Sequence, residues 1–166
     1  MSVDLRPATV DDAAAISTIY NHYVATSHVT FDLEPTSAET FVGKLSGAVD
    51  GPHQVVVAVD AEVVGYATSK AFRPKPAYAP SVETSVYVSA DHLGHGYGEA
   101  VYRYLLERLD GVGVNRAFAG VALPNDASDR LHRLLGFSPI GVFTQAGHKF
   151  DQWWDVAWYE RPCGLQ

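Results

Sequence analysis

Hydrophobic positions recur at two spacings along the chain, and the spacing predicts which segments are helices. Over residues 9–27 they return every three or four positions, which is the spacing of one helix face. The positions that share this face are Ile16, Ile19, Tyr20, Tyr23 and Val24. Thr9 or Asp11 stands where a polar side chain can cap the start of the helix. A second, shorter helix is expected to open at Thr36 or Ser37.

Runs of β-branched and aromatic residues predict strands in most of the remaining chain. Strands are expected at 3–8, on both sides of the turn 60–62 within 53–72, and at 81–89, 116–123, 137–143 and 151–160. Two further helices are expected at 99–109 and 125–136, and the proline-rich segment 73–80 must be a loop. Strands that first form a hairpin and later alternate with helices favour an α/β sandwich around one twisted sheet, in a single domain 1–166.

Composition and charge narrow the class of protein. The 166 residues are 47% hydrophobic, enough for one well-formed core. A formal net charge of -7, from 12 Lys and Arg against 19 Asp and Glu, argues against a general nucleic-acid binder. The single cysteine, Cys163, has no partner for an internal disulfide, and no apolar run reaches the ~20 residues of a membrane span. We therefore expect a cytoplasmic protein with neither membrane nor nucleic acid as a partner.

The segment HLGHGYGEAVYRYLLERLDG, residues 92–111, combines a glycine-rich turn with an amphipathic run. Its glycines, at positions 94, 96 and 98, lie between a predicted strand and a predicted helix, which is a common place for an anion to bind main-chain N–H groups. Neither the dinucleotide pattern GxGxxG nor the phosphate-loop pattern GxxxxGK[ST] fits. Taken alone, the pattern leaves an anion site and a tightly packed turn equally open.

Two motifs resemble those of the GCN5-related N-acetyltransferases. Residues 93–98 resemble their Q/R-x-x-G-x-G/A acetyl-CoA loop, with Leu93 in place of the usual Gln or Arg. NDASDRLHRLLGF, residues 125–137, resembles their N-x-x-S-x-x-L-Y-x-x-x-G-F block, with His132 in place of the usual tyrosine. TFDLEP, VETSVYVS and AGHKFDQWWDVAWYERP extend the likeness, in collinear order, to the phosphinothricin-type acetyltransferases, which acetylate the α-amino group of phosphinothricin or methionine sulfoximine.

The resemblance implies the GNAT fold, a mixed twisted central sheet flanked by helices, and acetyl-CoA as cosubstrate without a metal. The cofactor-binding positions it implies are Val86, Tyr87, Val88, Leu93, Gly94, His95, Gly96, Tyr97, Gly98, Glu99, Asn125 and Ser128. The main chain of Val86 and Val88 is expected to pair with the pantetheine arm. Asn125 either bonds that arm or only caps its helix. Because Leu93 offers no polar side chain, the backbone and helix dipole must carry more of the binding.

Glu83 and His132 are the catalytic candidates. Glu83 lies in an apolar strand, where it either faces solvent by alternation or serves the chemistry, and the resemblance assigns it as general base for direct acetyl transfer. His132 is one turn of helix before Leu135 and is by itself as easily a packing residue. Its match to the family position makes it either the acid that protonates the leaving thiolate or a second base.

A substrate pocket is expected around loop 73–80. Arg73 and Lys75 can clamp a carboxylate, with Tyr78 adding a hydroxyl, although such loop charges are more often merely solvated. The resemblance favours the clamp and points to Phe31 and Glu34 as the wall that holds the substrate side chain.

The last strand region is expected to join a core or a dimer interface. Lys149, Trp153 and Trp154 lie there, and the family resemblance predicts a homodimer with this tail near the substrate pocket. His92 and His95 have no evident third ligand, so a metal site is not expected. Alternatives left open are acetylation of another small amine, an antibiotic or a peptide amino terminus, and a non-catalytic module that binds CoA.

Overall fold

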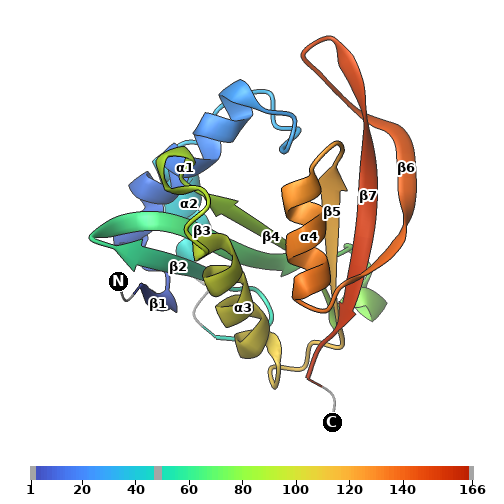
Figure 1. The fold of residues 1–166 in the computed structure, drawn as a ribbon. Coiled ribbons are helices and arrows are strands. Elements are labelled where there is room, and N and C mark those ends of the chain that lie inside the picture. The colour runs from blue at the N-terminus through green and yellow to red at the C-terminus, as the bar shows by residue number, and fades with distance from the viewer. Residues whose placement is uncertain (1–2, 47–49, 165–166) are drawn as a thin grey trace.

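The strands and helices of the computed structural model, which describes residues 3–46 and 50–164, follow the order expected from the pattern (Figure 1). The strands are β1 (Asp4–Pro7), β2 (Val55–Asp60), β3 (Glu62–Ala71), β4 (Ser81–Val88), β5 (Arg116–Ala122), β6 (Ser138–Lys149) and β7 (Gln152–Pro162). The α-helices are α1 (Ala13–Thr26), α2 (Ala38–Leu45), α3 (Tyr97–Leu109) and α4 (Asp126–Leu134). The expected α/β class is confirmed, and loop 73–80 contains only a 3-10 turn at Pro76–Tyr78.

One sheet holds all seven of these strands in the order β1-β2-β3-β4-β5-β7-β6. Every neighbouring pair is antiparallel except β4 and β5, which run parallel. Their register stops after three pairs, the last of which joins Glu83 to Phe118. Beyond that pair the strands diverge, and α4 lies beside the gap (Figure 1). We call the three pairs the parallel seam.

Helices cover both faces of the sheet. On one face, Ile16 and Ile19 of α1 and Phe41 of α2 pack on Tyr66 of β3. On the other face, α3 buries its apolar stripe against β2, β3, β4 and β5. Side chains of β4 alternate between these environments, so the odd positions of the strand point toward α1. Glu83 therefore faces the α1 side.

The helix starts show where local signals decide the structure. The Ser37 hydroxyl accepts the N–H of Thr40 at 3.2 Å, so Ser37 rather than Thr36 caps α2. Thr9 opens a 3-10 turn over Val10–Asp12, and α1 itself begins only after Asp12. This corrects the expected start at residue 9: the Asp12 carboxylate accepts the Thr9 N–H at 2.7 Å and tightens the first turn.

Two further boundaries differ from the expectation. Helix α3 begins at Tyr97 rather than at residue 99, because Gly96 takes a left-handed φ of 82° and serves as its N-cap. Strand β6 continues to Lys149 instead of ending at residue 143, because β7 pairs with it again at residues 147–149, beyond an irregularity after Phe143. None of the helices in the described residues has the length and apolar character of a membrane span. The same residues hold no group of three His, Cys, Asp or Glu side chains suited to a metal ion.

Candidate active site

A cleft of about 330 Å³ opens where β4 and β5 diverge. Its walls are β4, β5, the start of α3 and one side of α4. The residues expected at the cofactor that line it are Val86, Tyr87, Val88, Leu93, Gly98, Asn125 and Ser128, and His132 lines it as well. The structure therefore brings together side chains from three separate sequence motifs at one opening in the sheet.

Main-chain groups make up much of this cleft. Val86 and Val88 pair with β3 on one edge of β4, at Ala67 and Gly65. The other edge of β4 faces β5, but the register between these strands ends at Glu83. On that edge the Val88 carbonyl accepts the Tyr23 hydroxyl at 2.5 Å, and the remaining main-chain N–H and C=O groups beyond Glu83 are left for a ligand with amide groups of its own.

The glycine turn presents a second set of main-chain donors. Gly94 and Gly96 have φ values of 80° and 82°, and Gly96 is the N-cap of α3. Among the described residues, the N–H groups of residues 94–98 have no protein acceptor. Gly98 lets the helix approach β4, because a Cβ there would lie 3.2 Å from the Val88 side chain. Free N–H groups at a helix start fit a phosphate or diphosphate group.

Side chains of the same turn interact with the protein instead. The Tyr97 hydroxyl bonds the Asp60 carboxylate, and Glu99 pairs with Arg103 at 2.8 Å. His95 lies with its Nδ1 atom 3.0 Å from the Leu93 carbonyl oxygen. The expected contribution of these residues to cofactor binding would therefore come from their main chain.

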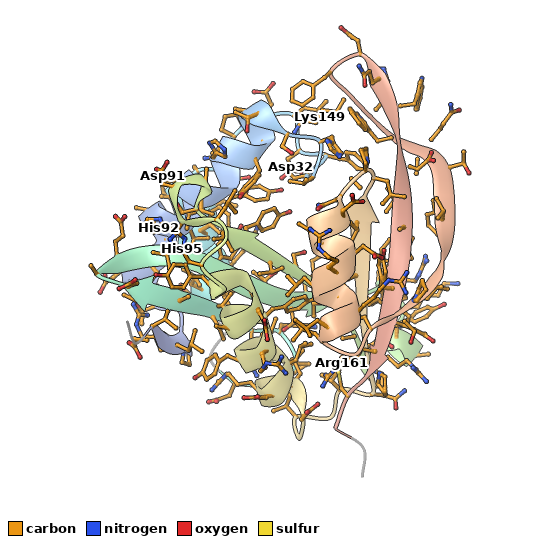
Figure 2. All side chains as sticks on the ribbon, in the orientation of Figure 1. Asp32, Asp91, His92, His95, Lys149 and Arg161 are labelled. Carbon is orange, nitrogen blue, oxygen red and sulfur yellow. The ribbon has the colours of Figure 1, made fainter. Side chains whose placement is uncertain are left out.

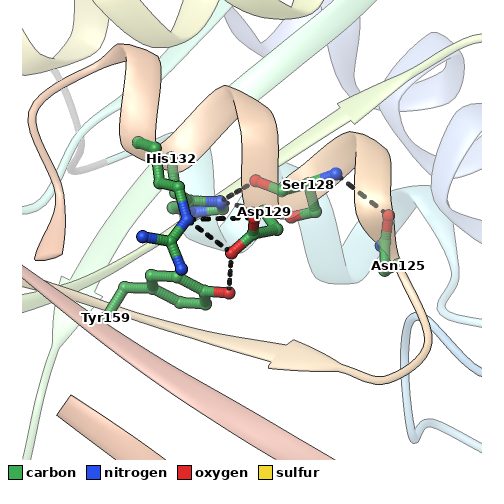
Figure 3. Close-up of polar contacts among 6 residues, drawn as sticks. Asn125, Ser128, Asp129, His132 and Tyr159 are labelled. Atoms are coloured by element: carbon green, nitrogen blue, oxygen red, sulfur yellow. Dashed lines mark hydrogen bonds and ion pairs between the residues drawn. The ribbon is translucent and has the colours of Figure 1, made fainter. Parts of the chain in front are cut away.

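His132 is held as a neutral imidazole in the wall of the cleft. Only 4% of the residue is exposed, and its Nδ1–H donates to the Ser128 carbonyl at 2.7 Å (Figure 3). Burial lowers the pKa of His132 below its ordinary value. Its Nε2 atom lies 3.3 Å from the hydroxyl of Tyr102, and its ring stacks on Tyr159 with centroids 5.3 Å apart. The ring lone pair is therefore on Nε2, which faces the buried Tyr102 hydroxyl.

Hydroxyl groups extend from His132 to the parallel seam. The Tyr102 hydroxyl lies 2.6 Å from Thr84 Oγ1, which is 3.3 Å from the main-chain oxygen of Phe118. Tyr102 was not singled out from the sequence, because its position on the apolar face of α3 is typical of a core residue. The Asn125 side chain accepts the Ser128 N–H at 3.0 Å and so caps α4 while also lining the cleft (Figure 3).

A second cavity, of about 660 Å³, lies on the α1 face of the sheet. Glu83 lines it, with a side chain that is 25% exposed and an oxygen 3.6 Å from Lys70 Nζ. Ser85, Tyr87 and Gly120 line both this cavity and the cleft, so the two spaces meet at β4 and β5. Glu83 thus lies on a cavity wall beside the junction and not on an open face of the sheet.

A hydrogen-bonded cluster forms another wall of the second cavity. The Tyr20 hydroxyl donates to the Asp32 carboxylate at 2.6 Å and lies 2.7 Å from Thr30 Oγ1. Burial raises the pKa of Tyr87 to about 12, so the phenol beside Glu83 stays protonated. Asp32 and Glu83 give the cavity two carboxylates that suit a cationic amine, and Lys44 and Lys70 line the same cavity, so it presents charges of both signs.

Of the expected substrate residues, Phe31 lines the second cavity. Glu34, Arg73, Lys75 and Tyr78 are exposed and line neither of the two spaces. The Arg73 guanidinium lies 4.9 Å above the ring of its neighbour Phe72. The basic side chains that do line the cavity, among the described residues, are Lys44, His53 and Lys70. No local pattern in the sequence indicates this set, because its members come one each from α2, the segment before β2, and β3.

The hairpin of β6 and β7 ties the loop after α1 in place. Lys149 is 4% exposed, and its Nζ donates to the Thr30 carbonyl at 2.9 Å. Burial lowers the pKa of Lys149, against the opposing effect of nearby Asp32, and Figure 2 shows both at the same end of the molecule. Trp154 stacks on His28 at 4.2 Å, whereas Trp153 is exposed. Lys149 and Trp154 therefore belong to the inner packing of the hairpin.

Comparisons with known proteins agree on one family. The Acetyltransferase (GNAT) family profile matches residues 16–137. The chain is 47% identical over 164 residues to the phosphinothricin N-acetyltransferase of Streptomyces coelicolor, covering 96% of both chains. It is 33% identical to the L-methionine sulfoximine/L-methionine sulfone acetyltransferase of Pseudomonas paraeruginosa, covering 96% of this chain and 94% of that one. A phosphinothricin acetyltransferase from Sinorhizobium meliloti, solved with acetyl-CoA, superposes with a TM-score of 0.92 at 33% identity, covering 99% of this chain and 90% of that one.

Proposed function

Because the chain belongs to the GNAT acetyltransferases and, among them, to the phosphinothricin and methionine sulfoximine N-acetyltransferase family, we propose that it acetylates the α-amino group of a small amino-acid analogue. Phosphinothricin, methionine sulfoximine and methionine sulfone are the candidate substrates. One observation carries the proposal: the main-chain cleft and the carboxylate-lined cavity meet at Ser85, Tyr87 and Gly120, next to Glu83. An acyl donor and an amine can therefore meet at a single place.

Acetyl-CoA is proposed as the occupant of the cleft. Main-chain N–H groups of residues 94–98 would hold its diphosphate, and the open edge of β4 around Val86 and Val88 would pair with the amides of pantetheine. Asn125 lies close enough to the cleft to contact the same arm. This arrangement would bring the thioester toward the junction with the second cavity.

Glu83 is proposed as the general base. It accepts a proton from the ammonium group, and the amine nitrogen then attacks the thioester carbon to form the C–N bond. Main-chain N–H groups of β4 would stabilise the oxyanion before the C–S bond breaks and the thiolate leaves. As the amide forms, the nitrogen loses its second proton and the thiolate takes up one, so CoA leaves as the thiol while Glu83 returns its proton to solvent. Since His132 is neutral and its Nδ1–H is committed to Ser128, we favour the role of second base over that of acid for this residue.

For the substrate carboxylate we retain Arg73 and Lys75, with Tyr78, as the proposed clamp. Arginine binds a carboxylate through two parallel N–H donors, whereas Lys70 is already paired with Glu83. Loop 73–80 lies outside the cavity of its own chain, so it would have to turn inward or be supplied by a second protomer.

A homodimer is proposed on the strength of the β6 edge. This strand is at the end of the sheet and has a row of main-chain groups without a neighbouring strand. Large apolar side chains are exposed along it, in the adjoining turn and at the start of β7, namely Ile140, Val142, Phe143, Phe150 and Trp153. Burial of such a surface against a second copy would satisfy both features. A cytoplasmic location remains part of the same proposal.

The decisive experiment is release of CoA thiol from acetyl-CoA in the presence of a panel of amino-acid analogues. We expect rapid release with methionine sulfoximine, methionine sulfone or phosphinothricin, and an N-acetyl product by mass spectrometry. Release only with other amines, an antibiotic or a peptide amino terminus would redirect the substrate class. Tight binding of CoA with no release for any acceptor would identify a non-catalytic module and overturn the proposal.

A further inference from the structure

Gly147 of β6 is in direct contact with the ring of Phe31, although more than a hundred positions separate them in the sequence. A Cβ atom added to Gly147 would lie 2.3 Å from two carbons of that ring and 2.6 Å from a third. The backbone of Gly147 has no positive φ, so its conformation is open to any residue. Glycine is required here by the contact and not by the turn of the chain.

The same ring lines the cavity that holds Glu83. Phe31 therefore separates the β6 backbone from the space proposed for the amino acid. Main-chain atoms on both sides of Phe31 are held: Lys149 donates to the Thr30 carbonyl, and the Asp32 N–H donates to Thr30 Oγ1 at 3.3 Å. With its backbone fixed, Phe31 can respond to a new neighbour only by rotating its side chain.

The hairpin around Gly147 is held by contacts of its own. The Trp154 indole donates to the Lys149 carbonyl at 2.9 Å and stacks on His28, with an interplanar angle of 11°. Gly147 itself is paired with Trp154 in the register of β6 and β7. The atoms that a Cβ would meet are at the far end of the Phe31 side chain, which is the part that moves at least cost.

We propose that Gly147 is a specificity-determining residue. Because it has no side chain, the Phe31 ring can pack directly on the β6 main chain, and this contact sets the depth of the amino-acid cavity. The inference rests on the proposed function, since it takes this cavity as the amino-acid site. A side chain at position 147 drives the ring toward Glu83 and shortens the space for the substrate side chain. Substrates with long side chains, such as phosphinothricin and methionine sulfoximine, then bind with a larger rise in KM than short amino acids do.

The test is Gly147→Ala, compared with Gly141→Ala. Gly141 is in the same strand, and a Cβ there would have nothing within 4 Å, so it controls for alanine in β6. We expect Gly147→Ala to raise KM for methionine sulfoximine about tenfold, with KM for acetyl-CoA unchanged and with the melting temperature of the Gly141→Ala control. An equal rise in both KM values would overturn the inference.

A double-mutant cycle with Phe31→Ala isolates the contact. If the ring transmits the effect, Gly147→Ala should change KM little once Phe31 is already alanine. Independent, additive effects would contradict the inference. A crystal structure of Gly147→Ala reads the ring directly: displacement toward Glu83 supports the inference, and an unmoved ring overturns it. Failure of the proposed function would show itself differently, as no CoA release by the unaltered chain with any amino acid.

Discussion

The cleft between β4 and β5 and the cavity beside α1 meet at the same strand but are built from different material. The cleft is bounded by the strand segments 84–88 and 119–122, by Leu93 and Gly98 of the glycine turn, and by one side of α4. The cavity consists of side chains from α1, α2, β3, β4 and the loop after α1, with the β6–β7 hairpin behind Phe31. A group common to many reactions can be held by backbone geometry, whereas the choice of acceptor depends on individual side chains. Substitutions in the two regions should therefore affect different kinetic constants.

Glu83→Gln should have the largest effect, because it removes the proposed base where the two regions meet. We expect kcat/KM to fall by about 10²–10⁴-fold, while KM for acetyl-CoA stays the same. Residual activity should rise with pH as more of the free amine forms without help. Steady-state kinetics from neutral to alkaline pH measure this, with Glu160→Gln as a control on β7, paired only with Arg116 at 3.7 Å. Full activity of Glu83→Gln at neutral pH would remove Glu83 from the mechanism.

Arg73→Ala tests whether the amino-acid site in the cavity beside α1 also includes the loop before β4. We expect KM for the amino acid to rise about tenfold and KM for acetyl-CoA to stay unchanged, because the bidentate contact with the carboxylate is lost. Arg73→Lys should recover part of the loss, since lysine keeps the charge without the two parallel donors. If Lys70→Met has the larger effect on amino-acid KM, the clamp lies inside the cavity and the assignment to Arg73 is wrong.

Gly96→Ala tests the backbone character of the cleft. A Cβ at φ 82° is strained by about 1–2 kcal/mol, so the turn should shift and weaken binding of acetyl-CoA several-fold. Gly113→Ala is the matched control, because Gly113 has φ 81° and likewise nothing within 4 Å of an added Cβ. Both variants should lose thermal stability, but only Gly96→Ala should raise KM for acetyl-CoA. The same KM for acetyl-CoA in Gly96→Ala and Gly113→Ala would mean that the glycine turn does not bind the cosubstrate.

The smallest effect we expect is on stability: apart from the loss of activity that a second base implies, His132→Asn should change how stability depends on pH. The folded protein holds His132 with a lowered pKa, whereas the unfolded chain takes up its proton below about pH 6.5. Stability from this group is thus present above that pH and is lost as the pH falls. The drop in melting temperature between about pH 7.5 and about pH 5.5 should therefore be smaller in His132→Asn than in the unaltered chain. An unchanged drop would show that His132 is not kept neutral by folding.

The cleft and the cavity also differ in how much of each can be predicted from the sequence. The order of elements, the glycine turn and the helix of His132 were predictable because each signal lies within a few consecutive residues. Boundaries shifted where a single bond decides them, as with Asp12 before α1, or where a distant partner extends a strand, as with β7 beside β6. Patterns of neighbouring residues therefore predict the elements around the cleft, but they predict the first and last residues of those elements less accurately.

Residues of the cavity were harder to find because their roles arise from contacts between distant segments. Tyr20 fits a helix core by spacing, yet its hydroxyl bonds Asp32. The Lys70 side chain is 64% exposed, and its place at the site becomes evident only from its ion pair with Glu83 on the neighbouring strand. Gly147 has no motif around it, and its importance depends on Phe31. No periodicity in one sequence encodes such pairs.

The parallel seam also bears on the order in which the chain folds. Strands β2, β3 and β4 pair through short connections, and β6 and β7 form a hairpin, so each set can assemble early from nearby segments. Pairing of β4 with β5 instead requires closure of the long crossover that contains α3, which costs loop-closure entropy. In return it forms only three residue pairs. On grounds of loop-closure entropy, we expect these two halves to form first and the seam to close last.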